Sequence, residues 1–141
     1  MVSDWDYRFY DLACEVSTWS KDPSTKVGAV IVDNSQRIVS TGYNGFPKGI
    51  ADDDRLLDRE LKNEMIIHGE MNAILFAHRD LTGCTIYTTP LLPCSRCAVI
   101  VIQSGIKRVV SPRVIPVRWR ESCARSIKMF AEAGVVVDLL Y

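Results

Sequence analysis

Two short motifs carry residues that can bind a metal ion and move protons. His68 and Glu70 are separated by one residue, and Cys94 and Cys97 form a C-x-x-C pair further along the chain. Imidazole nitrogens and thiolate sulfurs are good zinc ligands; structural zinc sites use four protein ligands, whereas catalytic sites use three and leave a position for water. Three such ligands are evident here, with a carboxylate beside them. We therefore expect His68, Cys94 and Cys97 to hold a catalytic zinc ion and Glu70 to act as general base and acid.

The alternative for these motifs is a structural zinc clip beside a surface glutamate, which the lack of a fourth ligand at a suitable spacing disfavours. His78 is the other histidine of the chain. It lies at the far end of the helix predicted after His68, too far away to share the metal, so we expect a capping or surface role for it.

Helix N-termini are the elements that would position both motifs. Good helix formers occupy residues 70–77, and Pro93 is expected in the first turn of an apolar helix over 94–103 that Gly105 ends. Two thiols one turn apart can then face the same metal while free backbone N–H groups point at their sulfurs.

The rest of the chain predicts an α/β fold. Alternating helix and strand patterns predict five strands with helices between them, which gives a mixed sheet covered on both faces. The expected strands are 27–32, 37–43, 84–89, 106–111 and 135–140, and the further helices are 4–20, 56–64 and 121–133. Without repeats or linkers, residues 1–141 are expected to form a single domain.

Composition excludes several classes of protein. The chain is 48% apolar and carries 17 basic and 17 acidic side chains, so its formal net charge is zero, which argues against nucleic acid as a partner. It has no apolar run long enough to span a membrane and no signal-peptide pattern at its N-terminus, so we expect a cytoplasmic protein. Five cysteines, an odd number, fit reduced thiols, with Cys14, Cys84 and Cys123 as buried packing residues.

Several stretches together resemble the deoxycytidylate (dCMP) deaminases of the cytidine deaminase superfamily, over nearly the whole chain. They are SKDPSTKVG at 20–28, GYNGFPKG at 42–49, the aspartates at 52–53, HGEMNAI at 68–74, PCSRC at 93–97 and AGV at 133–135. H-x-E with P-C-x-x-C marks the zinc nucleobase deaminases. The other motifs mark the dCMP branch.

This resemblance implies a three-layer α/β/α cytidine deaminase-like fold around the five-stranded mixed sheet. It implies zinc-dependent hydrolytic deamination of dCMP to dUMP and ammonia, which supplies thymidylate synthesis, by a homo-oligomer that relatives indicate is a hexamer. The rivals among enzymes are a free-nucleoside cytidine deaminase and a tRNA adenosine deaminase. A rival of another class is a catalytically silent zinc-binding module, which the intact Glu70 disfavours.

The resemblance also assigns substrate-binding residues. Asn44 matches the asparagine that faces the deoxyribose hydroxyl, with a turn asparagine as the alternative. Ser24 and Lys26 fall in the segment near the phosphate and base, although Lys26 could be plain surface charge. Gly69 stands where the family usually has alanine, and its backbone N–H would still serve the pyrimidine carbonyl.

Later in the chain, Trp119 lies between Arg118 and Arg120. Relatives place an aromatic residue and a cation at the nucleotide in this region, so we expect Trp119 to stack and Arg120 to contact the phosphate. An interface tryptophan is the alternative.

The loop that carries Gly45, Lys48 and Asp53 resembles the region that binds a nucleoside triphosphate regulator in this family. The resemblance therefore implies an allosteric site for dCTP or dTTP at a subunit boundary. A Mg²⁺ ion would accompany the triphosphate there.

Overall fold

A five-stranded sheet forms the middle layer of the computed structural model, which describes residues 2–141. The strand order is β2-β1-β3-β4-β5. The strands are β1 (Gly28–Val32), β2 (Ile38–Tyr43), β3 (Thr85–Thr89), β4 (Arg108–Pro112) and β5 (Val136–Leu140). β1 pairs antiparallel with β2 and β3, whereas β3, β4 and β5 are parallel. The sheet is therefore mixed, as predicted.

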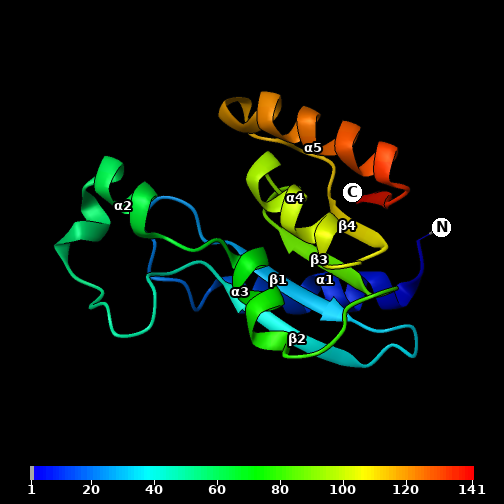
Figure 1. Cartoon of the computed structure of the whole chain (residues 1–141). Coiled ribbons are helices and arrows are strands. Elements are labelled where there is room, and N and C mark those ends of the chain that lie inside the picture. Colours follow the sequence, from blue (N-terminus) through cyan, green and yellow to red (C-terminus); the bar gives the residue numbers. More distant parts are fainter. Residues whose placement is uncertain (1) are drawn as a thin grey trace.

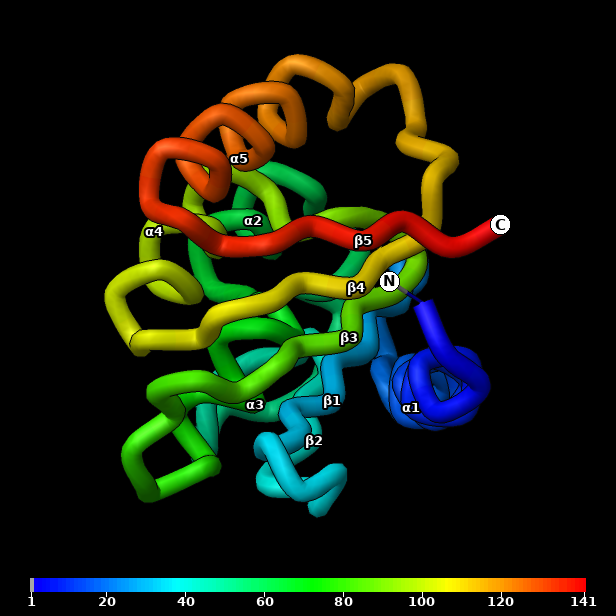
Figure 2. The backbone as a smooth tube through the Cα atoms, turned by 90° about the vertical axis from the view of Figure 1, so that its right-hand side faces the viewer, coloured from blue at the N-terminus to red at the C-terminus, as the bar shows by residue number. Residues whose placement is uncertain are grey.

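Helices cover both faces of this sheet (Figure 2). One face carries α1 (Asp4–Ser17), whose Phe9, Ala13 and Val16 join a buried cluster with alternate residues of the strands. The other face carries α3 (Gly69–Ala77), α4 (Ser95–Gln103) and α5 (Arg120–Ala133) around a second buried cluster. The predicted three-layer α/β/α arrangement is confirmed.

Local signals place the ends of these helices. His68 and Cys94 are the N-cap residues of α3 and α4, and α5 ends at Gly134, which has a φ of 76°. His78 is the C-cap of α3 with a left-handed φ of 51°, in agreement with the expected capping role. Pro93 precedes the N-cap of α4, so its prediction inside the first turn was wrong.

Two glycines allow helices to approach the sheet closely. A Cβ atom on Gly42 of β2 would overlap the backbone of α3 at Gly69 and Ala73. A Cβ atom on Gly28 of β1 would overlap the backbone of α1 at Ala13. The N-terminal half of α3, which carries the first motif, therefore lies directly against the strand backbone.

The segment after β2 lies to the side of the three layers (Figure 1). It contains η1 (Asp54–Leu57) and α2 (Arg59–Met65), where the sequence predicted one helix over 56–64. Asp58 separates the two, because its side chain accepts a hydrogen bond from the Leu61 N–H and caps α2. A third short helix, η2 (Val117–Trp119), lies between β4 and α5, where the sequence predicted no helix.

The cysteines outside the C-x-x-C motif are free thiols. Cys84 and Cys123 are buried as predicted, whereas Cys14 is half-buried. Within residues 2–141, no helix is both long and apolar enough to cross a membrane.

Candidate active site

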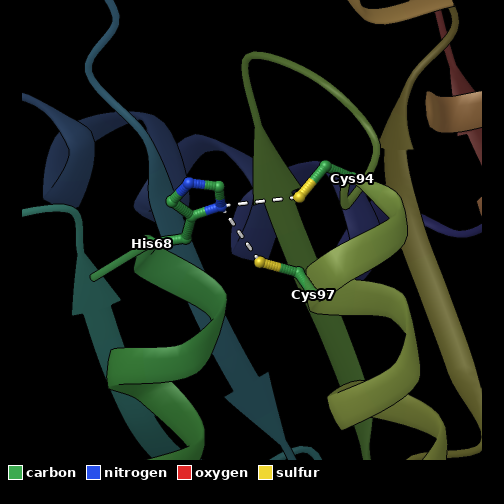
Figure 3. Close-up of side chains that lie close together, drawn as sticks. All are labelled: His68, Cys94 and Cys97. Atoms are coloured by element: carbon green, nitrogen blue, oxygen red, sulfur yellow. Dashed lines mark hydrogen bonds between the residues drawn. The ribbon is translucent and has the colours of Figure 1, made fainter. Parts of the chain in front are cut away.

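The N-termini of α3 and α4 bring together one imidazole and two thiols (Figure 3). The Nδ1 atom of His68 lies 3.2 Å from the sulfur of Cys97 and 3.5 Å from the sulfur of Cys94. All three candidate ligand atoms lie within 4.8 Å of one another. His68 is half-buried and both cysteines are buried, so the cluster is largely shielded from solvent.

These distances fit a tetrahedral zinc ion. With Zn–N near 2.0 Å and Zn–S near 2.3 Å, tetrahedral angles place N and S about 3.5 Å apart. Hydrogen bonds from Cys97 and from His68 lower the pKa of Cys94 to about 4, in spite of its burial. The pKa of Cys97 is raised by the hydrogen bond between the two thiols and by burial. A metal ion binds thiolates, so its binding would displace any proton that the two thiols carry.

Glu70 occupies the first turn of α3, beside the three ligands. Its side chain is buried, and within the described residues its Oε1 atom is the one buried side-chain oxygen or nitrogen that lacks a hydrogen-bond partner. Burial raises its pKa to about 7, where a carboxyl group can accept and donate protons near neutral pH. A buried carboxylate oxygen without a partner indicates a functional group rather than a structural one.

A cavity opens beside this cluster, and His68, Glu70 and Cys94 form part of its wall. Leu91, Leu92 and Val27 give the wall an apolar portion. An aromatic base could fit against this portion, next to the metal ligands.

Three cations also line the cavity, and none of them was among the predicted site residues: Arg59 and Lys62 from α2, and Arg118 from η2. The Nη2 atom of Arg118 donates a hydrogen bond of 2.8 Å to the hydroxyl of Thr25. The signal for Arg118 was present in the sequence, because it flanks Trp119 as Arg120 does. Arg59 and Lys62 gave no signal, because a charged helix after a loop is typical of any solvent-exposed segment.

The predicted substrate residues divide into two groups. Ser24, Asn44 and Trp119 line the cavity, whereas Lys26, Gly69 and Arg120 do not. The ammonium of Lys26 donates instead to the backbone carbonyl of Ser20 at 2.6 Å. Arg120 is the exposed first residue of α5.

Gly69 lies buried at the start of α3, between the histidine and the glutamate. A Cβ atom at this position would come 3.1 Å from the Cγ1 atom of Val27, so an alanine would require a small shift of that side chain.

Asn44 is already engaged with its own chain. Its Nδ2 group donates to the Thr25 carbonyl at 2.8 Å and to Asp22 at 3.2 Å, and its Oδ1 atom accepts from the Val27 N–H at 2.8 Å. Both amide hydrogens are thereby used. An amide oxygen has two lone pairs, so Oδ1 can still accept a hydrogen bond from a ligand hydroxyl.

The residues predicted for regulation do not form one cluster. Gly45 and Lys48 line a second hollow with Phe46, Asn72 and Phe76, and the Lys48 ammonium lies 4.7 Å from the Phe76 ring centroid. Gly45 also forms an isolated β-bridge with Ile67. Asp53 is absent from this hollow; its exposed carboxylate caps η1 and pairs with Arg55 at 2.8 Å.

Residues 3–112 match the family model of the cytidine and deoxycytidylate deaminase zinc-binding region. The chain is 48% identical over 143 residues to an Aliivibrio fischeri protein named "Uncharacterized deaminase in luxG 3'region", covering 99% of this chain and 96% of that protein. It is 40% identical over 114 residues to the deoxycytidylate deaminase of Pongo abelii, covering 76% of this chain. The aligned part makes up 64% of that longer protein, which is less than two thirds of its length.

A solved structure shares the fold. The dCMP deaminase of cyanophage S-TIM5, in complex with dCMP and dUMP, superposes with a TM-score of 0.81 at 24% identity. The superposition covers 99% of both chains. At this identity the likeness establishes the fold, a cytidine deaminase-like α/β/α architecture.

Proposed function

The chain belongs to the cytidine and deoxycytidylate deaminase zinc-binding family, and we propose that it hydrolyses dCMP to dUMP and ammonia. One observation carries this proposal: the buried carboxylate of Glu70, whose Oε1 atom has no hydrogen-bond partner, lies beside a three-ligand metal cluster in a cavity that cations also line. The apolar wall fits a pyrimidine, and the cations fit a phosphate. Residues 1–141 act as a single domain in this reaction.

His68, Cys94 and Cys97 would hold the zinc ion, and three protein ligands leave room for one further ligand. When bound, zinc supplies the Lewis acidity that makes water a nucleophile near neutral pH. The two thiolates lie at the positive end of α4, whose N–H groups offset part of their charge.

Glu70 moves the protons of the reaction. Its carboxylate takes a proton from water and delivers it to the ring nitrogen next to the carbon that is attacked. It then carries the second proton to the amino group, which leaves as ammonia. Both protons come from the same water, whose oxygen becomes the new carbonyl, so the reaction balances as dCMP plus water to dUMP plus ammonia.

The nucleotide side of the cavity selects the monophosphate. Trp119 offers a ring for stacking, the Oδ1 atom of Asn44 accepts from the sugar hydroxyl, and Arg59 and Arg118 supply charge for the phosphate. A free nucleoside has no phosphate for these cations to bind, which favours the monophosphate over deoxycytidine.

We also propose a metabolic role, a compartment, an oligomeric state and a regulatory site for this enzyme. The enzyme supplies thymidylate synthesis in the cytoplasm as a homohexamer. dCTP and dTTP, with Mg²⁺, regulate it at the second hollow that Gly45 and Lys48 line. The cation–π contact of Lys48 with Phe76 places a positive charge there that a triphosphate could use.

An ammonia-release assay tests the proposal. The purified, zinc-loaded enzyme is given dCMP, deoxycytidine, dCTP and a tRNA substrate, each with and without added dCTP or dTTP. We expect dCMP to have the highest kcat/KM by at least about tenfold, since a charge-assisted contact contributes about 1.5–3 kcal/mol. Equal turnover of deoxycytidine, or turnover of tRNA alone, would overturn it.

A further inference from the structure

The segment that carries Arg59 packs against few other elements of the protein. In Figure 1, α2 is set apart from the sheet and its covering helices, and its main packing partner is the adjoining η1. Both Arg59 and Lys62 of this segment nevertheless line the cavity. A specific contact must therefore hold α2 against the body of the protein.

That contact is a buried ion pair. The ammonium of Lys62 lies 3.0 Å from the Oδ1 atom of Asp22, and the two side chains are only 7% and 5% exposed. Lys62 is the buried residue of α2. Because a buried ion pair adds little net stability compared with an apolar pair, its value lies in the geometry that it imposes.

Asp22 forms hydrogen bonds with several residues on the side of the cavity away from the metal ligands. Besides Lys62, its Oδ1 atom accepts hydrogen bonds from the backbone N–H of Ser24 at 2.7 Å and of Thr25 at 3.3 Å. Its Oδ2 atom accepts from the Nδ2 group of Asn44 at 3.2 Å. One carboxylate thus fixes three cavity-lining residues, Ser24, Thr25 and Asn44, and Thr25 in turn accepts the hydrogen bond from Arg118.

We infer that Lys62 is a positioning residue for nucleotide binding. Its ammonium neutralises Asp22 where Asp22 orients Ser24 and Asn44, and the same contact docks α2 so that Arg59 forms part of the cavity wall. This inference rests on the proposed function for the identity of the ligand. Lys62 would act on binding and leave the metal cluster and Glu70 in place, because these lie on α3 and α4.

The chain offers a matched control. Asp6 and Arg108 form another ion pair at 2.8 Å, with side chains 5% and 22% exposed, between α1 and β4. Neither residue lines the cavity. Loss of this pair should affect stability without affecting nucleotide binding.

The experiment compares wild type with Lys62→Met, Lys62→Arg and Asp6→Asn. Calorimetry gives the Kd for dUMP, and steady-state assays give kcat and KM for dCMP; zinc content and Tm are measured for each protein. We expect Lys62→Met to raise both the Kd for dUMP and the KM for dCMP about tenfold, with kcat changed by less than about threefold and zinc content unchanged. Lys62→Arg should restore binding to within about threefold, and Asp6→Asn should lower Tm with wild-type binding.

Unchanged dUMP binding in Lys62→Met, or equal weakening in Asp6→Asn, would overturn the inference. If Lys62→Met does not fold, the double variant Lys62→Met, Asp22→Asn removes the unpaired carboxylate and should fold with the same weakened binding. Wild-type binding in that double variant would also count against the inference. A wild-type protein that binds dUMP but does not deaminate dCMP would reject the proposed function alone.

Discussion

The two sides of the cavity are built in different ways. On the metal side, His68, Glu70, Cys94 and Cys97 come from the first turns of two helices that pack directly on the sheet. On the nucleotide side, the polar residues come from the loop before β1, the end of β2, the detached α2 and the short η2. Under the proposed function, the groups that would perform chemistry thus lie on rigid elements, and the groups that would select the ligand lie on connecting segments.

This difference has an energetic counterpart. Glu70, Cys94 and Cys97 are buried and their positions are fixed by helix packing, whereas Arg59 and Arg118 are exposed residues at the cavity rim. Long exposed side chains must lose rotamer freedom when they bind a ligand. We therefore expect changes on the metal side to abolish turnover and changes on the nucleotide side to weaken binding.

The largest effect should come from Glu70→Gln. The amide keeps the shape of the side chain but cannot carry protons, so kcat for dCMP should fall about 10³- to 10⁴-fold. Zinc content and dUMP affinity should stay near wild type, as measured by metal analysis and calorimetry. Turnover within about tenfold of wild type would show that Glu70 is not the proton carrier.

Loss of a ligand should come next. Cys97→Ser removes one thiolate, and both bound zinc and activity should fall at least about 100-fold at limiting free zinc, because first ligands matter more than the outer partners whose loss costs 10–100-fold. Metal titration and the ammonia assay measure this. Cys14→Ser is the matched control, because the half-buried Cys14 thiol bonds only weakly to Thr89 at 3.6 Å and should be dispensable.

On the nucleotide side, Arg118→Gln and Arg59→Gln should each raise the KM for dCMP about tenfold and change that for deoxycytidine by less than about twofold. The guanidinium groups would meet only the phosphate. Lys26→Gln and Arg120→Gln are the comparison, since neither residue lines the cavity, and we expect changes of less than about threefold. If Lys26→Gln and Arg120→Gln raised the KM for dCMP more than the other two variants do, Lys26 and Arg120 would be the phosphate-binding residues.

The smallest effect on activity should come from Asp6→Asn, which should leave kcat and KM at wild-type values while Tm falls by about 5 °C at pH 7. Burial alone would raise the pKa of Asp6, but hydrogen bonds from Arg108, Tyr87 and Ser3 outweigh it and lower the pKa. The lowered pKa stabilises the fold above the unfolded value near 4, and this stability is lost as the pH falls through the folded value. The Tm difference between wild type and variant should therefore be constant from pH 8 to 5 and shrink below about pH 4; a constant difference at pH 3 would contradict it.

The two sides of the cavity also differ in how far the sequence could predict them. The metal side was readable because its spacings are local: one residue between His68 and Glu70 and two between Cys94 and Cys97 place them on helix starts. The helices and strands were readable because apolar residues recur at the period of each element. The five strands and the helices α3, α4 and α5 lie within two residues of their predicted ends, whereas α1 ends at Ser17, three residues before the end predicted for the helix over 4–20.

The nucleotide side was less readable because its contacts join distant segments. Asp22 meets Lys62 and Asn44 only through the fold, and a lysine in a charged helix gives no sign that it is buried. Arg118 and Arg120 both flank Trp119, yet Arg118 lies in η2 and lines the cavity, whereas Arg120 is the first residue of α5 and does not line it. Both arginines are neighbours of the same tryptophan, so the residue types in this stretch do not show which arginine meets the cavity.

The lack of a side chain at Gly42 of β2 matters for the geometry of the metal site. Since a methyl group there would collide with α3, any larger residue must lift the helix that bears both the imidazole and the carboxylate. The imidazole would move away from the thiols of α4, although no coordinating atom had been altered. The size of one residue within β2 therefore controls the distance between the imidazole and the two thiols, although that residue is not itself a metal ligand.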